Sequence, residues 1–297
     1  MDRFEYDGTG TLDHQSLPRD IATLVEDVDV PEHGFFGPDS TMWSVRRERS
    51  LFASGLSAIL LQLAHPLVAA GVADHSDFDA DPVGRFRRTF DYVHAIIFGD
   101  VDTAVEAALA VRELHTAVTG TIDEDPGRFE SGDSYTATDP ELLLWVHATL
   151  IEQSLTAYET YVEPLSNRDR TAYYQESKLF GQLFGIPVSA YPETLAEFFE
   201  YYERMLDAEL AVGPCGRELQ RALFRQGHVF GPLYATVGIG TLPDTVRDAY
   251  GLPWSSWRQR LFDAWTALVR ATVPSLPSRL RYVDAYRRAL ERVEPDE

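Results

Sequence analysis

Apolar residues recur at three- and four-residue intervals along most of the chain, the period of helices that bury one face. Asp81-Pro82 and Asp139-Pro140 each place a capping aspartate before a proline at the first helical position. No alternating strand run and no internal repeat interrupts the pattern, which predicts an all-α fold made of a single multi-helix domain. The expected helices cover about 42–65, 66–71, 82–99, 100–118, 139–161, 169–184, 192–210, 215–236, 243–250, 253–272 and 280–293, with a polar loop at 121–138.

The first 40 residues lack this periodicity. Proline and glycine punctuate them at Pro18, Pro31, Gly34, Gly37 and Pro38. We therefore expect residues 1–40 to form an irregular N-terminal arm and residues 41–297 to form the helical domain.

An uncharged stretch, residues 51–73, is long enough to span a bilayer. It contains Gln62, His65 and Pro66 and many alanines, whereas a membrane span is richer in large apolar residues and has a basic flank. We interpret the stretch as two buried core helices broken at Pro66. A membrane-associated protein anchored by this stretch is the alternative, and it makes peripheral membrane contact a further expectation.

The formal net charge of the 297-residue chain is −21, and Lys178 is the one lysine among 26 basic residues. A dense carboxylate surface keeps a protein hydrated where salt screens repulsion. The composition therefore indicates a halophilic protein, and an acidic mesophilic protein is the alternative. No basic stripe is visible in the sequence, so nucleic acid is not an expected partner.

The cysteine and N-terminal patterns bear on the cellular compartment. The single cysteine, Cys215, excludes an intramolecular disulfide and a Cys-rich zinc site, which fits a reducing interior. Residues 1–20 lack the basic segment and apolar run of a signal peptide. We expect a cytoplasmic protein.

Several common catalytic patterns are missing from the sequence. It contains no G-x-G-x-x-G, no P-loop, no G-x-S-x-G elbow and no H-E-x-x-H pair. A ferritin-like di-iron site needs Glu-x-x-His twice, and this spacing does not occur. The usual non-haem route by which a helical bundle handles oxygen is therefore not indicated.

Three histidines occupy apolar surroundings. His65 ends the uncharged helix before Pro66, and His115 and His147 each replace an apolar residue on a helical stripe. A single histidine of this kind is most often a core residue hydrogen-bonded to a neighbour. Three of them favour an internal cofactor site. The two stripes contain Val101, Ala104, Ala108 and Val111 before His115, and Leu143, Leu144, Leu150 and Ile151 around His147.

The helix that begins at Pro82 adds a polar pair. Arg85 and Thr89 are four residues apart and share a helical face with Val93 and Ile96, so we expect both to point toward the core. A buried guanidinium is costly without an anionic partner. The pair therefore indicates either an internal ion pair or contact with a cofactor propionate or a reacting oxygen species.

Five motifs in order resemble the family of MpaB-type oxygenases and latex-clearing rubber oxygenases. The likeness runs from Trp43 toward the C-terminus and no motif is specific alone. The motifs are Leu61-Gln-Leu-Ala-His-Pro66, Gly84-Arg-Phe-Arg-Arg-Thr89, Phe98-Gly-Asp100, Val111-Arg-Glu-Leu-His115 and Pro140-Glu-Leu-Leu-Leu-Trp-Val-His-Ala148.

The resemblance implies a globin-like helical core that holds haem b. Arg85 and Thr89 match the family's Arg-x-x-x-Thr pair near the haem, and His115 matches the iron ligand best, with His147 as second candidate. His65 is a further residue expected near the cofactor. Arg88 stands where rubber oxygenases have a lysine, and a guanidinium is a very poor iron ligand.

The implied function is a haem b-dependent oxygenase that acts with O2 on a small apolar substrate, unsaturated or prenyl-like. The alternatives are a haem-binding sensor or carrier without turnover, and a haem-free helical protein. Neither the substrate, the choice between cleavage and hydroxylation, nor the oligomeric state follows from the sequence.

Overall fold

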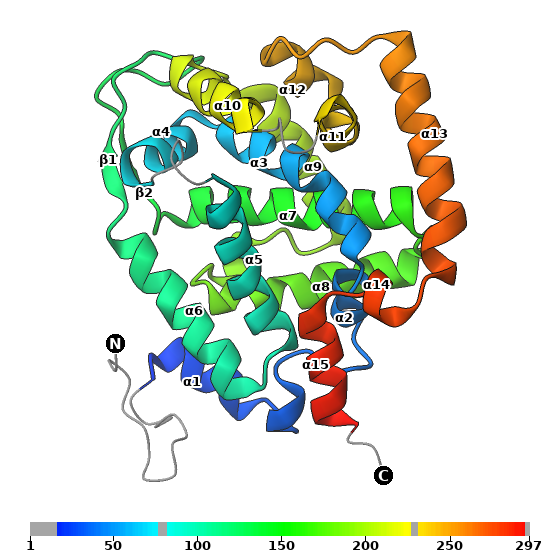
Figure 1. The fold of residues 1–297 in the computed structure, drawn as a ribbon. Coiled ribbons are helices and arrows are strands. Elements are labelled where there is room, and N and C mark those ends of the chain that lie inside the picture. Colours follow the sequence, from blue (N-terminus) through cyan, green and yellow to red (C-terminus); the bar gives the residue numbers. More distant parts are fainter. Residues whose placement is uncertain (1–16, 77–81, 227–230, 295–297) are drawn as a thin grey trace.

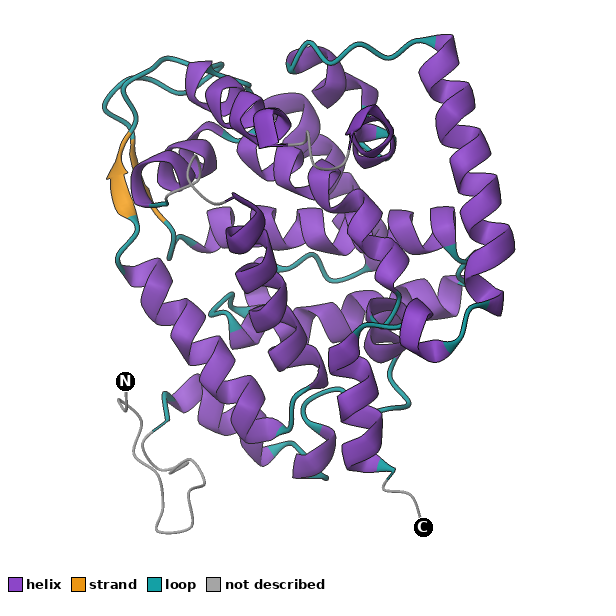
Figure 2. Ribbon diagram, viewed as in Figure 1, coloured by secondary structure: helices purple, strands orange, loops and turns teal. Residues whose placement is uncertain are grey.

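Helices make up nearly all of the regular structure (Figures 1 and 2). The structure is a computed structural model that describes residues 17–76, 82–226 and 231–294. The all-α prediction is confirmed. In chain order the elements are α1 Arg19–Glu26, α2 Thr41–Arg46, α3 Gly55–Leu63, α4 Pro66–His75, α5 Pro82–Phe98, α6 Val101–Thr116, β1 Thr119–Thr121, β2 Ser134–Thr136, α7 Pro140–Tyr161, α8 Asn167–Leu183, α9 Leu195–Arg204, α10 Pro214–Gln226, α11 Gly231–Ile239, α12 Asp244–Ala249, α13 Ser256–Thr272, α14 Ser278–Arg281 and α15 Asp284–Val293.

Helix α7 runs through the middle of the molecule (Figure 1). It begins as expected at Pro140, where the Asp139 side chain accepts a hydrogen bond from the backbone N–H of Glu141 at 2.8 Å. Trp145 and Tyr161 are fully buried along it, and α2, α3, α8 and α13 pack against it. The apolar residues of α7 are therefore the centre of the core.

Helices α5 and α6 form an antiparallel hairpin (Figure 1). The N-terminal segment packs closely against the turn between them, because a Cβ on Gly34 would meet the carbonyl oxygen of Gly99. Asp100 caps α6 by accepting from the N–H of Thr103 at 2.9 Å. The two helices lie close together at this turn and spread apart toward the start of α5 and the end of α6 (Figure 1).

The irregular-arm prediction is wrong for Arg19–Glu26, which is helix α1. Its apolar face buries Ile21, and its polar face carries Asp20, which pairs with Arg112 of α6 at 2.7 Å. The three-residue spacing of Ile21 and Leu24 could have predicted this helix, but the prolines on either side of it favoured an irregular segment. The boundary between arm and domain stays a prediction.

The helix expected over 42–65 is interrupted. After α2 the chain forms a 3₁₀ segment, Arg49–Ser54, before α3 begins. At the interruption Glu48 is buried and its backbone pairs with Tyr282, so a tertiary contact overrides the helical pattern. The expected loop at 121–138 also contains the strand β2, which pairs with β1 just before the loop in a short antiparallel hairpin, where Gly120 faces Tyr135.

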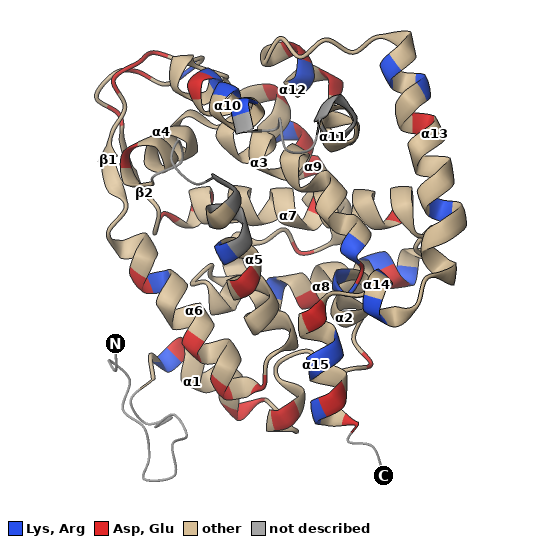
Figure 3. Ribbon diagram, viewed as in Figure 1, with Lys and Arg blue, Asp and Glu red and all other residues tan. Residues whose placement is uncertain are grey.

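The uncharged stretch forms two helices with a break at Pro66, as expected. Most of α3 is buried and, as Figure 3 shows, it carries no charged residue. Among the described residues no single helix is long and apolar enough to cross a membrane. The pair Arg49–Leu63 and Pro66–His75 passes that test by length and composition, with a bend of 104° between its two parts.

Candidate functional site

The polar residues expected on α5 lie on its first turns. The backbone of Arg85 belongs to α5, and its side chain lies outside the described residues. Arg88 and Thr89 are both exposed, so the expectation that Thr89 points into the core is wrong. Among the side chains of α5 that the structure describes, the buried ones are Val93, Ile96, Ile97 and Phe98, which lie in the second half of the helix.

His115 lies in the last turn of α6 and is half-buried. Its Nδ1 atom is buried and has no hydrogen-bond partner among the described residues. Burial lowers the pKa of the imidazole below its ordinary value, so the ring is neutral near pH 7. A neutral imidazole with an unsatisfied buried nitrogen is costly in a purely structural role.

His147 sits in the middle of α7 and is only 6% exposed. Its Nδ1 lies 2.6 Å from the hydroxyl oxygen of Tyr191, and its ring stacks on Phe180 with centroids 5.3 Å apart. A Cβ on Gly181 would collide with the Tyr191 hydroxyl and approach His147 Nδ1 to 2.9 Å. His147 therefore has the contacts of a core histidine in a space kept open by a glycine.

His65 is the residue before α4 and is 4% exposed. Like His115, it has a buried Nδ1 without a hydrogen-bond partner among the described residues. Burial, and secondarily the charge of Arg128, lowers its pKa to about 4, while Asp139 acts in the opposite direction. Its ring lies against Phe129 with centroids 5.3 Å apart.

The structure places His65 and His115 at the same end of the molecule. Phe129, which touches His65, belongs to an apolar cluster against which Val118 packs. Val118 follows His115 by three residues, and its Cγ1 would lie 3.4 Å from a Cβ on Gly71 of α4. His147 contacts α8 and Tyr191 instead.

His94 is a site candidate that the sequence analysis did not single out. It lies on α5 one turn from Phe90 and one turn from Phe98, and its ring contacts both of them and Phe52. Burial and the charges of nearby arginines lower its pKa to about 3. The i−4 and i+4 aromatic neighbours were the signal that could have identified it.

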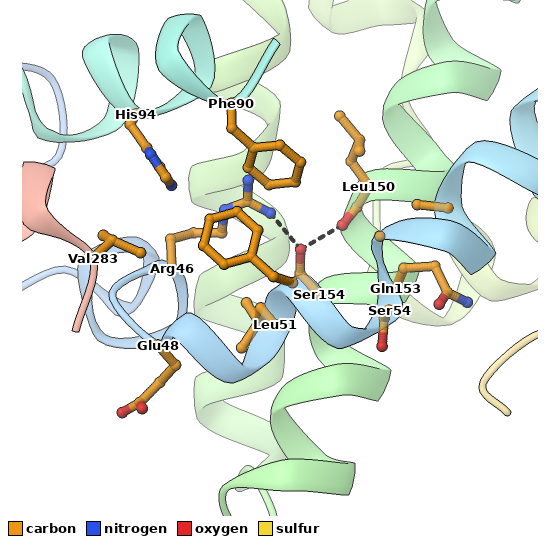
Figure 4. A pocket seen from close by; sticks show the side chains of 13 residues that line it. Arg46, Glu48, Leu51, Ser54, Phe90, His94, Leu150, Gln153, Ser154 and Val283 are labelled. Carbon is orange, nitrogen blue, oxygen red and sulfur yellow. Dashed lines mark hydrogen bonds between the residues drawn. The ribbon is translucent and has the colours of Figure 1, made fainter. Parts of the chain in front are cut away.

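His94 lines two adjacent hollows. One is a small pocket of about 40 Å³ between α5, the 3₁₀ segment and α7 (Figure 4). The other is an open cleft of about 690 Å³ between α5 and α15. Separately, no three His, Cys, Asp or Glu side chains gather as a metal site among the described residues.

The buried histidines make stability depend on pH. A folded-state pKa of about 3 for His147, against an ordinary value of 6.5, means that the unfolded chain binds more protons between these values. The contribution of neutral His147 to the free energy of unfolding is present above pH 6.5 and is lost as the pH falls toward 3. We expect His147 alone to account for a loss of about 2 kcal/mol between pH 6.5 and pH 5 in denaturant titrations.

A matched pair of variants isolates this effect. His147→Asn should make the unfolding free energy depend less steeply on pH above pH 5, because one titrating group is gone while His65 and His94 remain. His75→Asn should leave that dependence unchanged, since His75 is exposed. Equal slopes for wild type and His147→Asn would contradict the assignment.

The comparisons with known proteins identify the class. The family described as "ER-bound oxygenase mpaB/B'/Rubber oxygenase, catalytic domain" has a sequence model that matches residues 42–271, well over half of the chain. The chain therefore belongs to this family of oxygenase catalytic domains, and the resemblance inferred from the five motifs is confirmed.

Two relatives are similar to this chain over most of its length. They are the uncharacterized proteins Mb2261 of Mycobacterium bovis and Rv2237 of Mycobacterium tuberculosis. Each is 29% identical over 232 residues, covering 74% of this chain and 88% of the relative. No solved structure matches the chain, so the globin-like arrangement of the core stays a prediction.

Proposed function

We propose that this protein is a haem b-dependent oxygenase in which His115 would hold the haem iron. The observation that carries the proposal is the buried Nδ1 of His115, which lacks a hydrogen-bond partner among the described residues and lies in a ring that burial keeps neutral. Ligation needs the neutral imidazole, and a haem iron needs only one such ligand from the protein.

The three histidine candidates fit this role unequally. His147 is enclosed by Tyr191 and Phe180, and the pocket beside it has only about 10 Å³, less than a macrocycle requires. His65 shares the unsatisfied Nδ1 of His115 but is almost fully buried. His115 is half-buried in the last turn of its helix, which leaves one side of the ring accessible to a cofactor.

Bound haem supplies the iron at which dioxygen is activated. His115 would hold it, with the imidazole kept unprotonated by burial. Arg85 and Thr89 would donate hydrogen bonds to a propionate or to the reacting oxygen. Arg88, a permanently protonated guanidinium, would act as a positive charge and not as a ligand.

Substrate turnover separates this proposal from a sensor or carrier. Squalene, an unsaturated prenyl hydrocarbon, should cause oxygen uptake by the haem-loaded protein, and squalane, its saturated analogue, should not. An oxygen electrode and product analysis measure both. Haem loading without oxygen uptake across a panel of prenyl lipids of different lengths would favour the carrier.

A further inference from the structure

The small pocket and the cleft beside α5 are adjacent and share part of their walls. Phe52, Phe90, His94 and Val283 line both of them. The outer cleft, at about 690 Å³, lies within the range of about 300–1,000 Å³ that ligand sites occupy. The inner pocket, at about 40 Å³, has room for a few water-sized groups. An elongated ligand could therefore run along the cleft and end in the pocket.

Arg46 lines the inner pocket and has no carboxylate partner among the described residues. It is half-buried, and its Nη1 donates one hydrogen bond, to the neutral Oγ of Ser154 at 2.6 Å (Figure 4). A guanidinium has five N–H donors in a planar fork, which matches both oxygens of a carboxylate. Removing such a group from water is costly unless an anion compensates it.

Glu48 also lines the pocket but is committed to another arginine. Its carboxylate pairs with Arg281, with Nη2 2.7 Å from Oε1, and its side chain is fully buried. In Figure 4 this carboxylate points away from Arg46. The charge of Arg46 is therefore left uncompensated inside the pocket.

The rim of the outer cleft carries three arginines, Arg49, Arg288 and Arg292, and two aspartates, Asp91 and Asp284. Arg49 pairs with Asp284 at 2.8 Å, and Arg288 lies on the same cleft as Asp91. The charges of Arg46, Arg288 and Arg49 help to keep His94 neutral, so it adds no positive charge. Within a chain of net charge −21, this cleft thus has a positive inner end, aromatic walls and a rim with one more arginine than aspartates.

We propose that the cleft binds an apolar molecule that ends in a carboxylate, as a fatty acid does. Its carboxylate lies on Arg46 in the inner pocket, and its chain lies along Phe52, Phe90 and Phe98. The binding of this ligand does not depend on the function proposed above. The further statement that the ligand is the substrate of an oxygenase does rest on that function.

Decanoate and decanol test the proposal, because they share a chain length and differ in head-group charge. In calorimetric titrations of the full-length purified protein, decanoate should bind at least tenfold more tightly than decanol. Arg46→Gln should weaken decanoate binding at least tenfold and change decanol binding less than twofold. Arg270→Gln is the control, since it removes the same charge from an exposed position on α13 and should change neither.

Several results would overturn the assignment. One is equal affinity of the wild-type protein for decanoate and decanol, which needs no variant. Another is a preference for decanoate that survives in Arg46→Gln. If Arg46→Gln does not fold, Arg46→Lys replaces it, and this variant should retain part of the preference because it keeps the charge.

Haem binding gives an independent readout. Arg46→Gln should leave the Soret absorption of the haem-loaded protein unchanged. Loss of that band in this variant, or its displacement by decanoate, would mean that the cleft holds a haem propionate and that the fatty-acid assignment is wrong. If the protein binds decanoate as described but never binds haem, the fatty-acid inference stands and the proposed function is wrong.

Discussion

Replacing His115 by alanine is expected to abolish haem retention. The imidazole is the one link that we propose between protein and iron, so its removal should eliminate the Soret band of protein purified with haem. The fold should survive, because the half-buried ring makes no protein hydrogen bond through Nδ1 among the described residues. Absorption spectroscopy measures the first effect, and circular dichroism checks the second.

His147→Ala is the matched control for the ligand. It should keep the Soret band and lower the unfolding free energy by about 1–3 kcal/mol, because the buried Tyr191 hydroxyl loses its partner. The reverse outcome, a colourless His147→Ala and a coloured His115→Ala, would show that the proximal ligand is His147.

Arg281→Ala is expected to be strongly destabilising. Glu48 is buried with no exposed side-chain surface, and Arg281 contacts it through Nε at 3.0 Å and Nη2 at 2.7 Å. Without Arg281, Arg47 at 3.8 Å is the remaining ion-pair partner of Glu48 among the described residues. Removing one partner of a buried pair costs about 3–5 kcal/mol, which denaturant unfolding measures directly.

Arg279→Ala is the control for that variant. Arg279 lies two residues earlier on α14 and is exposed, so its loss should change the unfolding free energy by less than about 0.5 kcal/mol. Similar effects of the two substitutions would mean that the Glu48 contact does not hold the C-terminal helices to the core.

The helix boundaries on α5, α6 and α7 followed from the sequence because local chemistry determines them. Asp139 forms the side-chain cap that its position before Pro140 predicted, and Asp100 forms the same kind of cap at the start of α6. The break after α2 did not follow, because it depends on Glu48 meeting a residue more than 200 positions later in the chain. Helical periodicity contains no information about such a distant partner.

Only part of the candidate site could be predicted, because the positions of its residues also depend on tertiary packing. Periodicity correctly placed His147 in the core and also placed Thr89 there, where the structure shows it exposed. A stripe tells which face of a helix is apolar, but how far along the helix the core extends depends on its neighbours. His94 and Arg46 come together only through tertiary packing, which no local motif specifies.

The absorption spectrum of the purified full-length protein, before and after addition of hemin, tests the central claim most directly. We expect the wild-type protein to show a Soret band, either on isolation or after hemin is added to a ratio of one haem per chain. We expect His115→Ala to lack this band. A colourless protein whose spectrum with hemin equals that of free hemin would contradict the central claim.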